Sequence, residues 1–222
     1  MQIGETHQGI FDLSFFKLIP NLTIMAPKDF KELEDMMSFA IKLKSPVVIR
    51  YPRGGEAQEK FNIHSYIVQK QMEKLTKGED VTIIAIGNQV SKAMSIFRKL
   101  KKENINAEVL NARFLKPFDI SSVMASINKT KLVVTIEDNT LIGGLATEVK
   151  EIIAEKHLKD IHVRSFGYPD VFIEHGTIPE LEKQYRTDEN TILNYIRNTV
   201  TIRKKKENHL IENKKEIEKS RK

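Results

Sequence analysis

The sequence predicts an α/β fold with a mainly parallel sheet that is covered by helices on both faces. Short apolar segments rich in β-branched residues, typical of buried strands, alternate with longer segments whose apolar residues recur at helical spacing. Gly, Pro and Asn stand between many of these segments, where turns are needed. The chain has 222 residues, 40% of them hydrophobic, which suffices for one domain of ~100–150 residues and part of another.

The first unit, residues 1–54, contains one strand–helix–strand crossover. Residues 22–26 form an apolar run closed by Pro27, and residues 46–51 form a second run ended by Pro52, so both predict strands. Between them the apolar residues from Leu33 to Leu43 follow a helical period, with Asp29 as the expected N-cap. A single crossover cannot close a hydrophobic core, so we expect this unit to be part of a larger domain.

The second unit, residues 80–200, repeats the alternation more fully. Residues 55–79 are polar and weakly patterned, and we interpret them as a linker. Strands are expected at 81–86, 107–111, 132–136 and 161–166. Helices are expected at 90–102 and 120–127, from the Gly143-Gly144 pair to about His157, and from Pro179 and Asp188 onward. We expect the basic tail, residues 201–222, to be a frayed helix or disordered.

The charge distribution argues against a nucleic-acid partner. The net charge is +6, but nine of the 36 basic residues lie between Arg203 and Lys222, and the rest of the chain is nearly neutral. No apolar run approaches the ~20 residues of a membrane span, and the first ten residues do not resemble a secretory signal. The absence of cysteine excludes disulfides and thiolate chemistry. We therefore expect a cytoplasmic protein that contacts neither nucleic acid nor membrane.

His7 is the most chemically capable residue, since an imidazole can act as acid, base or hydrogen-bond donor near neutral pH. Taken alone, a loop histidine bonded to a backbone carbonyl is the more common interpretation. The surrounding motifs change that balance. They are Thr6-His7-Gln8-Gly9-Ile10-Phe11-Asp12, Ile19-Pro20-Asn21, Met25-Ala26-Pro27-Lys28-Asp29, Arg50-Tyr51-Pro52-Arg53-Gly54 and, much later, Gly167-Tyr168-Pro169-Asp170.

In this order the motifs resemble the C-terminal part of the 1-deoxy-D-xylulose-5-phosphate synthases, thiamine-diphosphate enzymes of the transketolase group. The resemblance implies an incomplete pyrimidine-binding-domain end followed by a transketolase C-terminal-like domain. It implies that His7 is catalytic and transfers a proton, and that Arg53 binds the phosphate of glyceraldehyde 3-phosphate with its guanidinium fork. Arg50 belongs to the same motif and is a second candidate for this phosphate, although a structural ion pair is the interpretation we favour for it.

Three further motifs resemble family segments but are expected to be structural. The run from Arg113 to Asp119 resembles a turn of the second domain. Glu137-Asp138-Asn139 with Gly143-Gly144 resembles an acidic turn before a helix, where tight packing is favoured over anion binding. Glu174 and His175 could form an acid–base pair, but the resemblance implies a structural role for them, and we do not count them as catalytic. The remaining histidines show no metal-ligand spacing, so we expect no dedicated metal site in this chain.

The resemblance covers about residues 4–200, the C-terminal third of the family's length. In the family a Gly-Asp-Gly motif with a downstream Asn holds the diphosphate and Mg²⁺, and a glutamate activates the cofactor; neither has a counterpart here. Ile3 also stands where the family has Asp. We therefore expect a fragment of a homodimeric enzyme that condenses decarboxylated pyruvate with glyceraldehyde 3-phosphate for isoprenoid and thiamine synthesis. We expect the chain to be inactive alone.

Two alternatives remain. The chain could be one subunit of a split transketolase or the β subunit of a 2-oxo acid dehydrogenase, in which a separate chain holds the diphosphate. It could also be a noncatalytic module in which the second unit serves dimerisation or regulation.

Overall fold

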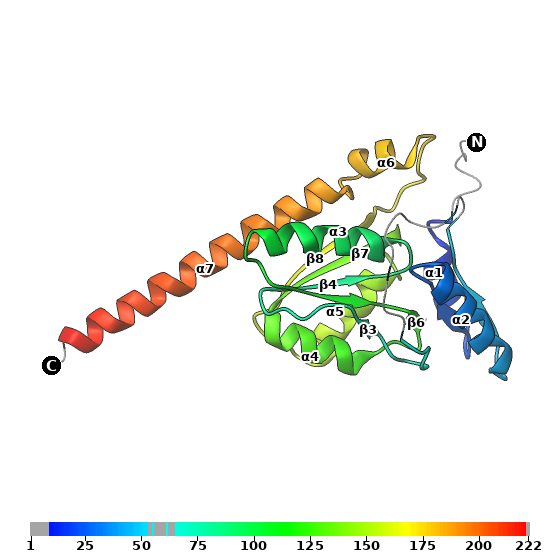
Figure 1. Cartoon of the computed structure of the whole chain (residues 1–222), viewed down its shortest axis with the longest axis horizontal. Coiled ribbons are helices and arrows are strands. Elements are labelled where there is room, and N and C mark those ends of the chain that lie inside the picture. The colour runs from blue at the N-terminus through cyan, green and yellow to red at the C-terminus, as the bar shows by residue number, and fades with distance from the viewer. Residues whose placement is uncertain (1–8, 53–54, 56–60, 62–64, 221–222) are drawn as a thin grey trace.

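The computed structural model describes residues 9–52, 55, 61 and 65–220, and side chains within its last helix up to Lys206 and at His209. The chain forms two sheets of unequal size that lie end to end (Figure 1). No helix in this described part is both long and apolar enough to cross a membrane.

The larger sheet has five strands in the order β3-β5-β4-β7-β8. Four of them are parallel, and only the edge strand β3 runs antiparallel, against β5. Their bounds are β3 (Glu73–Lys74), β4 (Val81–Ala85), β5 (Ala107–Asn111), β7 (Leu132–Thr140) and β8 (His162–Tyr168). The expected mainly parallel sheet is confirmed.

Helices cover both faces of this sheet (Figure 1). On one face α3 (Gln89–Lys102) and α7 (Glu189–Ser220) bury their apolar sides, for example Ile96 of α3 and Ile196 of α7, against β4. On the other face α4 (Ile120–Thr130) and α5 (Leu145–Glu155) pack on β4 and β7. The short helix α6 (Ile178–Gln184) precedes α7, and a capping box between Thr177 and Glu180 starts it.

The smaller sheet contains the predicted crossover. Strands β1 (Thr23–Met25) and β2 (Val47–Ile49) are parallel, and α2 (Phe30–Lys42) connects them. Asp29 is the N-cap of α2, because its carboxylate accepts the N–H of Glu32 at 2.7 Å. The helix α1 (Asp12–Lys17) precedes β1.

The third strand of the smaller sheet comes from the second unit. Strand β6 (Phe114–Lys116) pairs antiparallel with β1, and Phe114 is buried against Met25 and Met36. The sequence predicts a turn at this position instead of a strand. The strand has only three residues and its partner lies in the other unit, so no local pattern marks it. The core of the first unit is thus partly built by the second.

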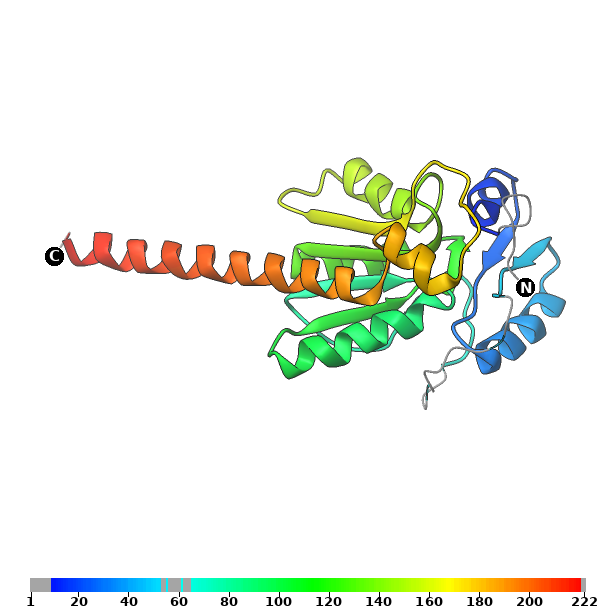
Figure 2. The same ribbon diagram turned by 90° about the horizontal axis from the view of Figure 1, so that it is seen from above.

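Two segments have more structure than expected. The predicted linker contains β3, and its neighbour Met72 is buried. The tail from residue 201, expected to be a frayed helix or disordered, continues α7 to Ser220 and projects away from the sheets (Figures 1 and 2). Its sequence favours a helix, because it lacks Gly and Pro, is rich in Lys and Glu, and extends a helix already anchored by Ile196 and Val200.

Candidate functional site

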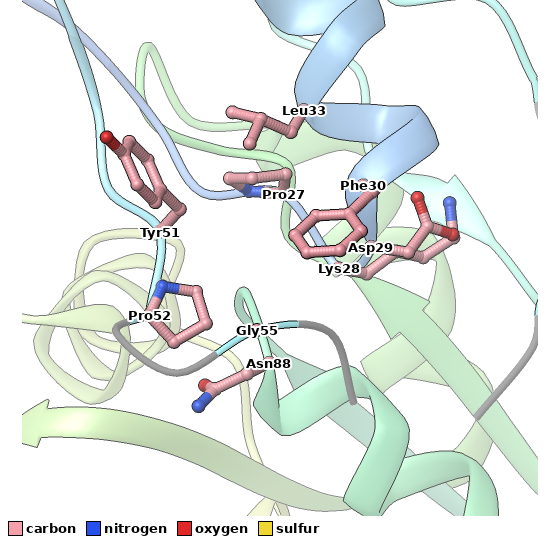
Figure 3. A pocket seen from close by; sticks show the side chains of 9 residues that line it. All are labelled: Pro27, Lys28, Asp29, Phe30, Leu33, Tyr51, Pro52, Gly55 and Asn88. Carbon is pink, nitrogen blue, oxygen red and sulfur yellow. The ribbon is translucent and has the colours of Figure 1, made fainter. Parts of the chain in front are cut away.

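The carboxyl ends of β1 and β2 meet the start of α3, which follows β4. Ligands of parallel α/β sheets usually bind at this edge. The structure has a small pocket here, with about 30 Å³ of free space. In Figure 3, Tyr51 and Pro52 stand across it from Phe30 and Leu33. The lining residues are Pro27, Lys28, Asp29, Phe30, Leu33, Tyr51, Pro52, Gly55 and Asn88.

The described wall of this pocket is largely apolar. Its two charged residues serve the fold: Asp29 caps α2, and the ammonium group of Lys28 is fully buried in ion pairs. Tyr51 is 61% exposed. The described wall thus offers mainly apolar contacts.

Arg50 follows β2 directly and ties three segments together. Its Nη2 donates to the carbonyl oxygen of Gly9 at 3.0 Å and to that of Asp138 at 2.8 Å. Its Nε lies 3.5 Å from the Asp12 carboxylate, and Nη2 lies 3.4 Å from the Asp138 carboxylate. The Arg50 side chain is only 12% exposed, and it forms ion pairs with Asp12 and Asp138. A role of Arg50 in phosphate binding stays a prediction.

The segment that follows His7 is attached to the larger sheet by further contacts. The N–H of Thr140 donates to the carbonyl oxygen of Ile10 at 2.7 Å. The ring of Phe11 packs edge-on against Phe172 with centroids 5.8 Å apart. Burial raises the pKa of Asp12, although Arg50 beside it acts in the opposite direction. Residues 9–12 are therefore held in place from both units.

The other candidate residues have separate outcomes. His7 and Arg53 lie outside the described residues, so their roles stay predictions. Glu174 and His175, set aside as noncatalytic, are exposed in the loop before α6. Within the described ranges, no three His, Asp or Glu side chains come together as a metal site.

Glu137 is a buried group whose position the sequence analysis missed. It lies within β7 rather than in a turn, and its two carboxylate oxygens accept the N–H groups of Leu145 and Ala146, each at 2.8 Å. Burial raises its pKa to about 7, despite these hydrogen bonds. A Cβ at Gly144 would lie 2.1 Å from this carboxylate. The chain's own carboxylate therefore fills the helix N-terminus, as the packing interpretation of the glycine pair requires.

A buried ionic cluster, formed by Lys28, Glu32, Glu73 and Arg113, joins the two units. Lys28 Nζ lies 3.2 Å from Glu32 and 2.8 Å from Glu73. Arg113 lies 2.5 Å from Glu32 through Nε and 2.8 Å from Glu73 through Nη2. Burial alone would raise the pKa of Glu73, but Lys28 and Arg113 hold it below its usual value. Arg113, in the motif for which a structural role is expected, therefore links its own unit to Glu32 of the first unit and to Glu73.

Comparison with known proteins identifies the class of this fold and site. The model of the transketolase C-terminal domain matches residues 70–192, and that of the transketolase pyrimidine-binding domain matches residues 2–56. The chain therefore belongs to the transketolase family, whose members are thiamine-diphosphate-dependent.

Within this family the chain is similar to 1-deoxy-D-xylulose-5-phosphate synthases, which confirms the resemblance found in the sequence. It is 45% identical over 191 residues to the enzyme of Halothermothrix orenii, covering 86% of this chain and 30% of that enzyme. It is 40% identical over 193 residues to that of Caldanaerobacter subterraneus, covering 87% of this chain and 31% of the relative. The chain thus spans about 30% of these relatives, their C-terminal portion.

Solved structures agree on the fold. A split-gene transketolase, described as an inactive β4 tetramer, superposes with a TM-score of 0.81 at 31% identity, covering 89% of this chain and 64% of that one. A transketolase of Pichia stipitis has a TM-score of 0.67 at 24% identity, covering 90% of this chain and 28% of its own.

Proposed function

We propose that this chain is the C-terminal part of a 1-deoxy-D-xylulose-5-phosphate synthase and supplies one side of its active site. The observation that carries this proposal is the attachment by Arg50 of the segment after His7 to the carboxyl edges of β2 and β7. The 45% identity to the Halothermothrix orenii enzyme supports this activity within the family. The reaction would condense the two-carbon unit of decarboxylated pyruvate with glyceraldehyde 3-phosphate.

Each candidate residue then has one task. His7 would move a proton to or from the reacting donor, as imidazoles do near neutral pH. Arg53 would hold the phosphate dianion of glyceraldehyde 3-phosphate through paired N–H donors. Arg50, whose donors face Gly9, Asp12 and Asp138, would keep the His7 segment in position rather than bind phosphate.

Thiamine diphosphate supplies the carbanion chemistry of the family when it is bound. The described residues do not fit its diphosphate and Mg²⁺, because none of their carboxylates or imidazoles form a metal-binding group, and the two charged residues of the largely apolar pocket wall, Lys28 and Asp29, are engaged in the fold. We therefore infer that another polypeptide segment holds the cofactor and that this chain is inactive alone. We further propose that the enzyme is a cytoplasmic homodimer. We also propose that the two units of this chain span residues 1–54 and 80–200.

A reconstitution experiment tests the proposal. The chain is mixed with the upstream portion of the Halothermothrix orenii relative, thiamine diphosphate, Mg²⁺, pyruvate and glyceraldehyde 3-phosphate, and product is measured by mass spectrometry. We expect deoxyxylulose phosphate from the mixture, none from either chain alone, and at least a hundredfold loss with His7→Ala, the usual scale for acid–base residues being ~10²–10⁴. Product from this chain alone would refute its dependence on another segment.

A split transketolase subunit is a second candidate, favoured by the 31% identity and TM-score of 0.81 to a split-gene transketolase. The two candidates differ in the donor substrate. Turnover of a ketose phosphate donor, with none of pyruvate, in the same mixture would support the transketolase and contradict the synthase.

A further inference from the structure

The helix α1 belongs to the first unit in sequence, yet it is attached to the second unit near both of its ends. Near its start, the hydroxyl group of Ser14 donates to the carbonyl oxygen of Ile142 at 2.6 Å. At its end, the ammonium group of Lys17 forms an ion pair with Glu148 of α5. Leu13 is 1% exposed, because it is buried in the same core as the apolar side of α5. The second unit therefore determines where α1 lies.

Asn139, near the end of β7, makes the central contact of this attachment. It is 0% exposed, and its Nδ2 donates both to Ser14 Oγ and to the carbonyl oxygen of Thr140, each at 2.7 Å. The next peptide group acts on the chain just before α1, because the N–H of Thr140 donates to the carbonyl oxygen of Ile10 at 2.7 Å. These neighbouring residues of β7 thus hold both α1 and the segment that enters it.

The Gly143-Gly144 pair leaves room for these contacts. Gly143 has a φ of +73°, and a Cβ at this position would lie 3.2 Å from Ser14 Cβ. A Cβ at Gly144 would lie 2.8 Å from Asn139 Nδ2. Side chains at these two positions would therefore press on both partners of the bond between Asn139 and Ser14.

The surroundings of Asn139 suit the placement of α1 better than they suit stability. Its Oδ1 is buried and accepts no hydrogen bond within the described part of the chain. A buried amide oxygen without a partner lowers stability, and an apolar side chain of the same shape would avoid this cost. Such a side chain would lack the two N–H donors, which are the groups that reach Ser14 and Thr140.

We propose that Asn139 is a positioning residue of the active site, whose amide group holds Ser14 and thereby fixes the segment that follows His7. His7 lies two positions before Gly9, the first described residue, so the placement of α1 and Ile10 bears directly on it. Asn139 acts from β7, whereas Arg50 acts on Gly9 from the end of β2. This inference rests on the proposed function, because it assumes that His7 transfers a proton.

The test measures kcat and KM in the reconstituted mixture described for the proposed function. Asn139→Asp keeps the shape of the side chain but removes both donors, and Asn139→Ala removes the whole amide group. Each should lower kcat at least about tenfold, because His7 is displaced, while KM for glyceraldehyde 3-phosphate stays within about twofold. Ser14→Ala removes the other partner of the same bond. The double variant Asn139→Ala with Ser14→Ala should therefore lose about as much as the worse single variant.

Thr82→Val is the matched control. Thr82 is 0% exposed, and its Oγ1 lies 2.7 Å from Ser126 Oγ and 2.8 Å from Thr130 Oγ1, so its loss also breaks two buried hydrogen bonds. It stands near the start of β4, away from the carboxyl edge of the sheet. The variant should lower the urea midpoint of unfolding and leave kcat unchanged.

Hydrogen exchange of the 222-residue chain by itself gives a readout that needs no activity. In Asn139→Asp the amides of Thr140 and of α1 should lose protection, while those of β4 keep it. Unchanged exchange or an unchanged kcat in Asn139→Asp, additive losses in the double variant, or an equal fall of kcat in Thr82→Val would each overturn the proposal. If exchange changes as expected but the wild-type mixture yields no deoxyxylulose phosphate, the proposed function fails and the attachment of α1 by Asn139 stands.

Discussion

At the scale of single residues, the carboxyl group of Glu137 shows how burial and hydrogen bonding oppose each other. Two N–H groups of α5 favour its charged form, yet burial dominates and raises the pKa to about 7. Because the pKa of Glu137 is higher in the folded state, protonation of this carboxyl group favours folding. This contribution to stability is complete below pH 4.5, the ordinary pKa, and is lost as the pH rises through about 7.

Glu137→Gln should therefore flatten the pH dependence of stability. Between pH 4.5 and 8 the wild type should lose up to about 3 kcal/mol of unfolding free energy through this group, following ~1.36 kcal/mol per pKa unit. The variant does not titrate at this position and should lose much less. Urea unfolding at pH 5, 6, 7 and 8 measures the difference, with Glu174→Gln as an exposed control. Parallel pH profiles for Glu137→Gln and wild type would contradict the assignment.

At the scale of helices and strands, the sequence predicts those elements whose apolar pattern lies within the element itself. The strand Val81–Ala85 and the helix Gln89–Lys102 carry their own apolar periodicity, and both were expected within a residue or two. Strand β6 pairs with β1, about ninety positions earlier, and three residues give too little pattern to reveal that partner. Arg50 has the same limitation, because its partner Asp138 is 88 positions away.

Phe114→Ala tests the role of β6 in the first unit. The ring is 1% exposed and meets Phe39 edge-on with centroids 5.8 Å apart, so its removal leaves a cavity among Met25 and Met36. We expect a loss of about 3–5 kcal/mol in unfolding free energy, measured by urea denaturation. Hydrogen exchange should show that β1 and β2 lose protection more than β4. Phe172→Ala, at a 69% exposed ring, should cost far less; equal costs would count against the packing role.

At the scale of the whole molecule, the buried ionic cluster couples the two units. Lys28 and Glu32 come from the first unit, Arg113 from the second, and Glu73 from the predicted linker. The low pKa of Glu73 stabilises the fold above the carboxylate's ordinary value of 4.5, and this stabilisation is lost as the pH falls below it. The alternation of elements predicted two units, but the contact that joins them needed the three-dimensional structure.

Lys28→Met should destabilise the protein by about 3–5 kcal/mol at pH 7, because it leaves buried carboxylates with too little positive charge. Lys31→Met is the matched control, since Lys31 is half exposed and pairs with Glu34 and Asp35 on the same helix. Its cost should stay below about 1 kcal/mol. Urea unfolding of both variants provides the comparison, and a similar small effect for each would show that the cluster does not couple the units.

Strand β6 has one more consequence, for how genes of this family can be divided. Although β6 and Arg113 follow the predicted linker in sequence, they complete the sheet and the charge balance of the unit that precedes it. A gene cut within the linker would separate β1 and β2 from the strand that shields them, and each product would inherit an unfinished core. We therefore expect the described portion from residue 9 to α7 to fold as one piece, and a chimaera that exchanges the first unit to need β6 from the same parent.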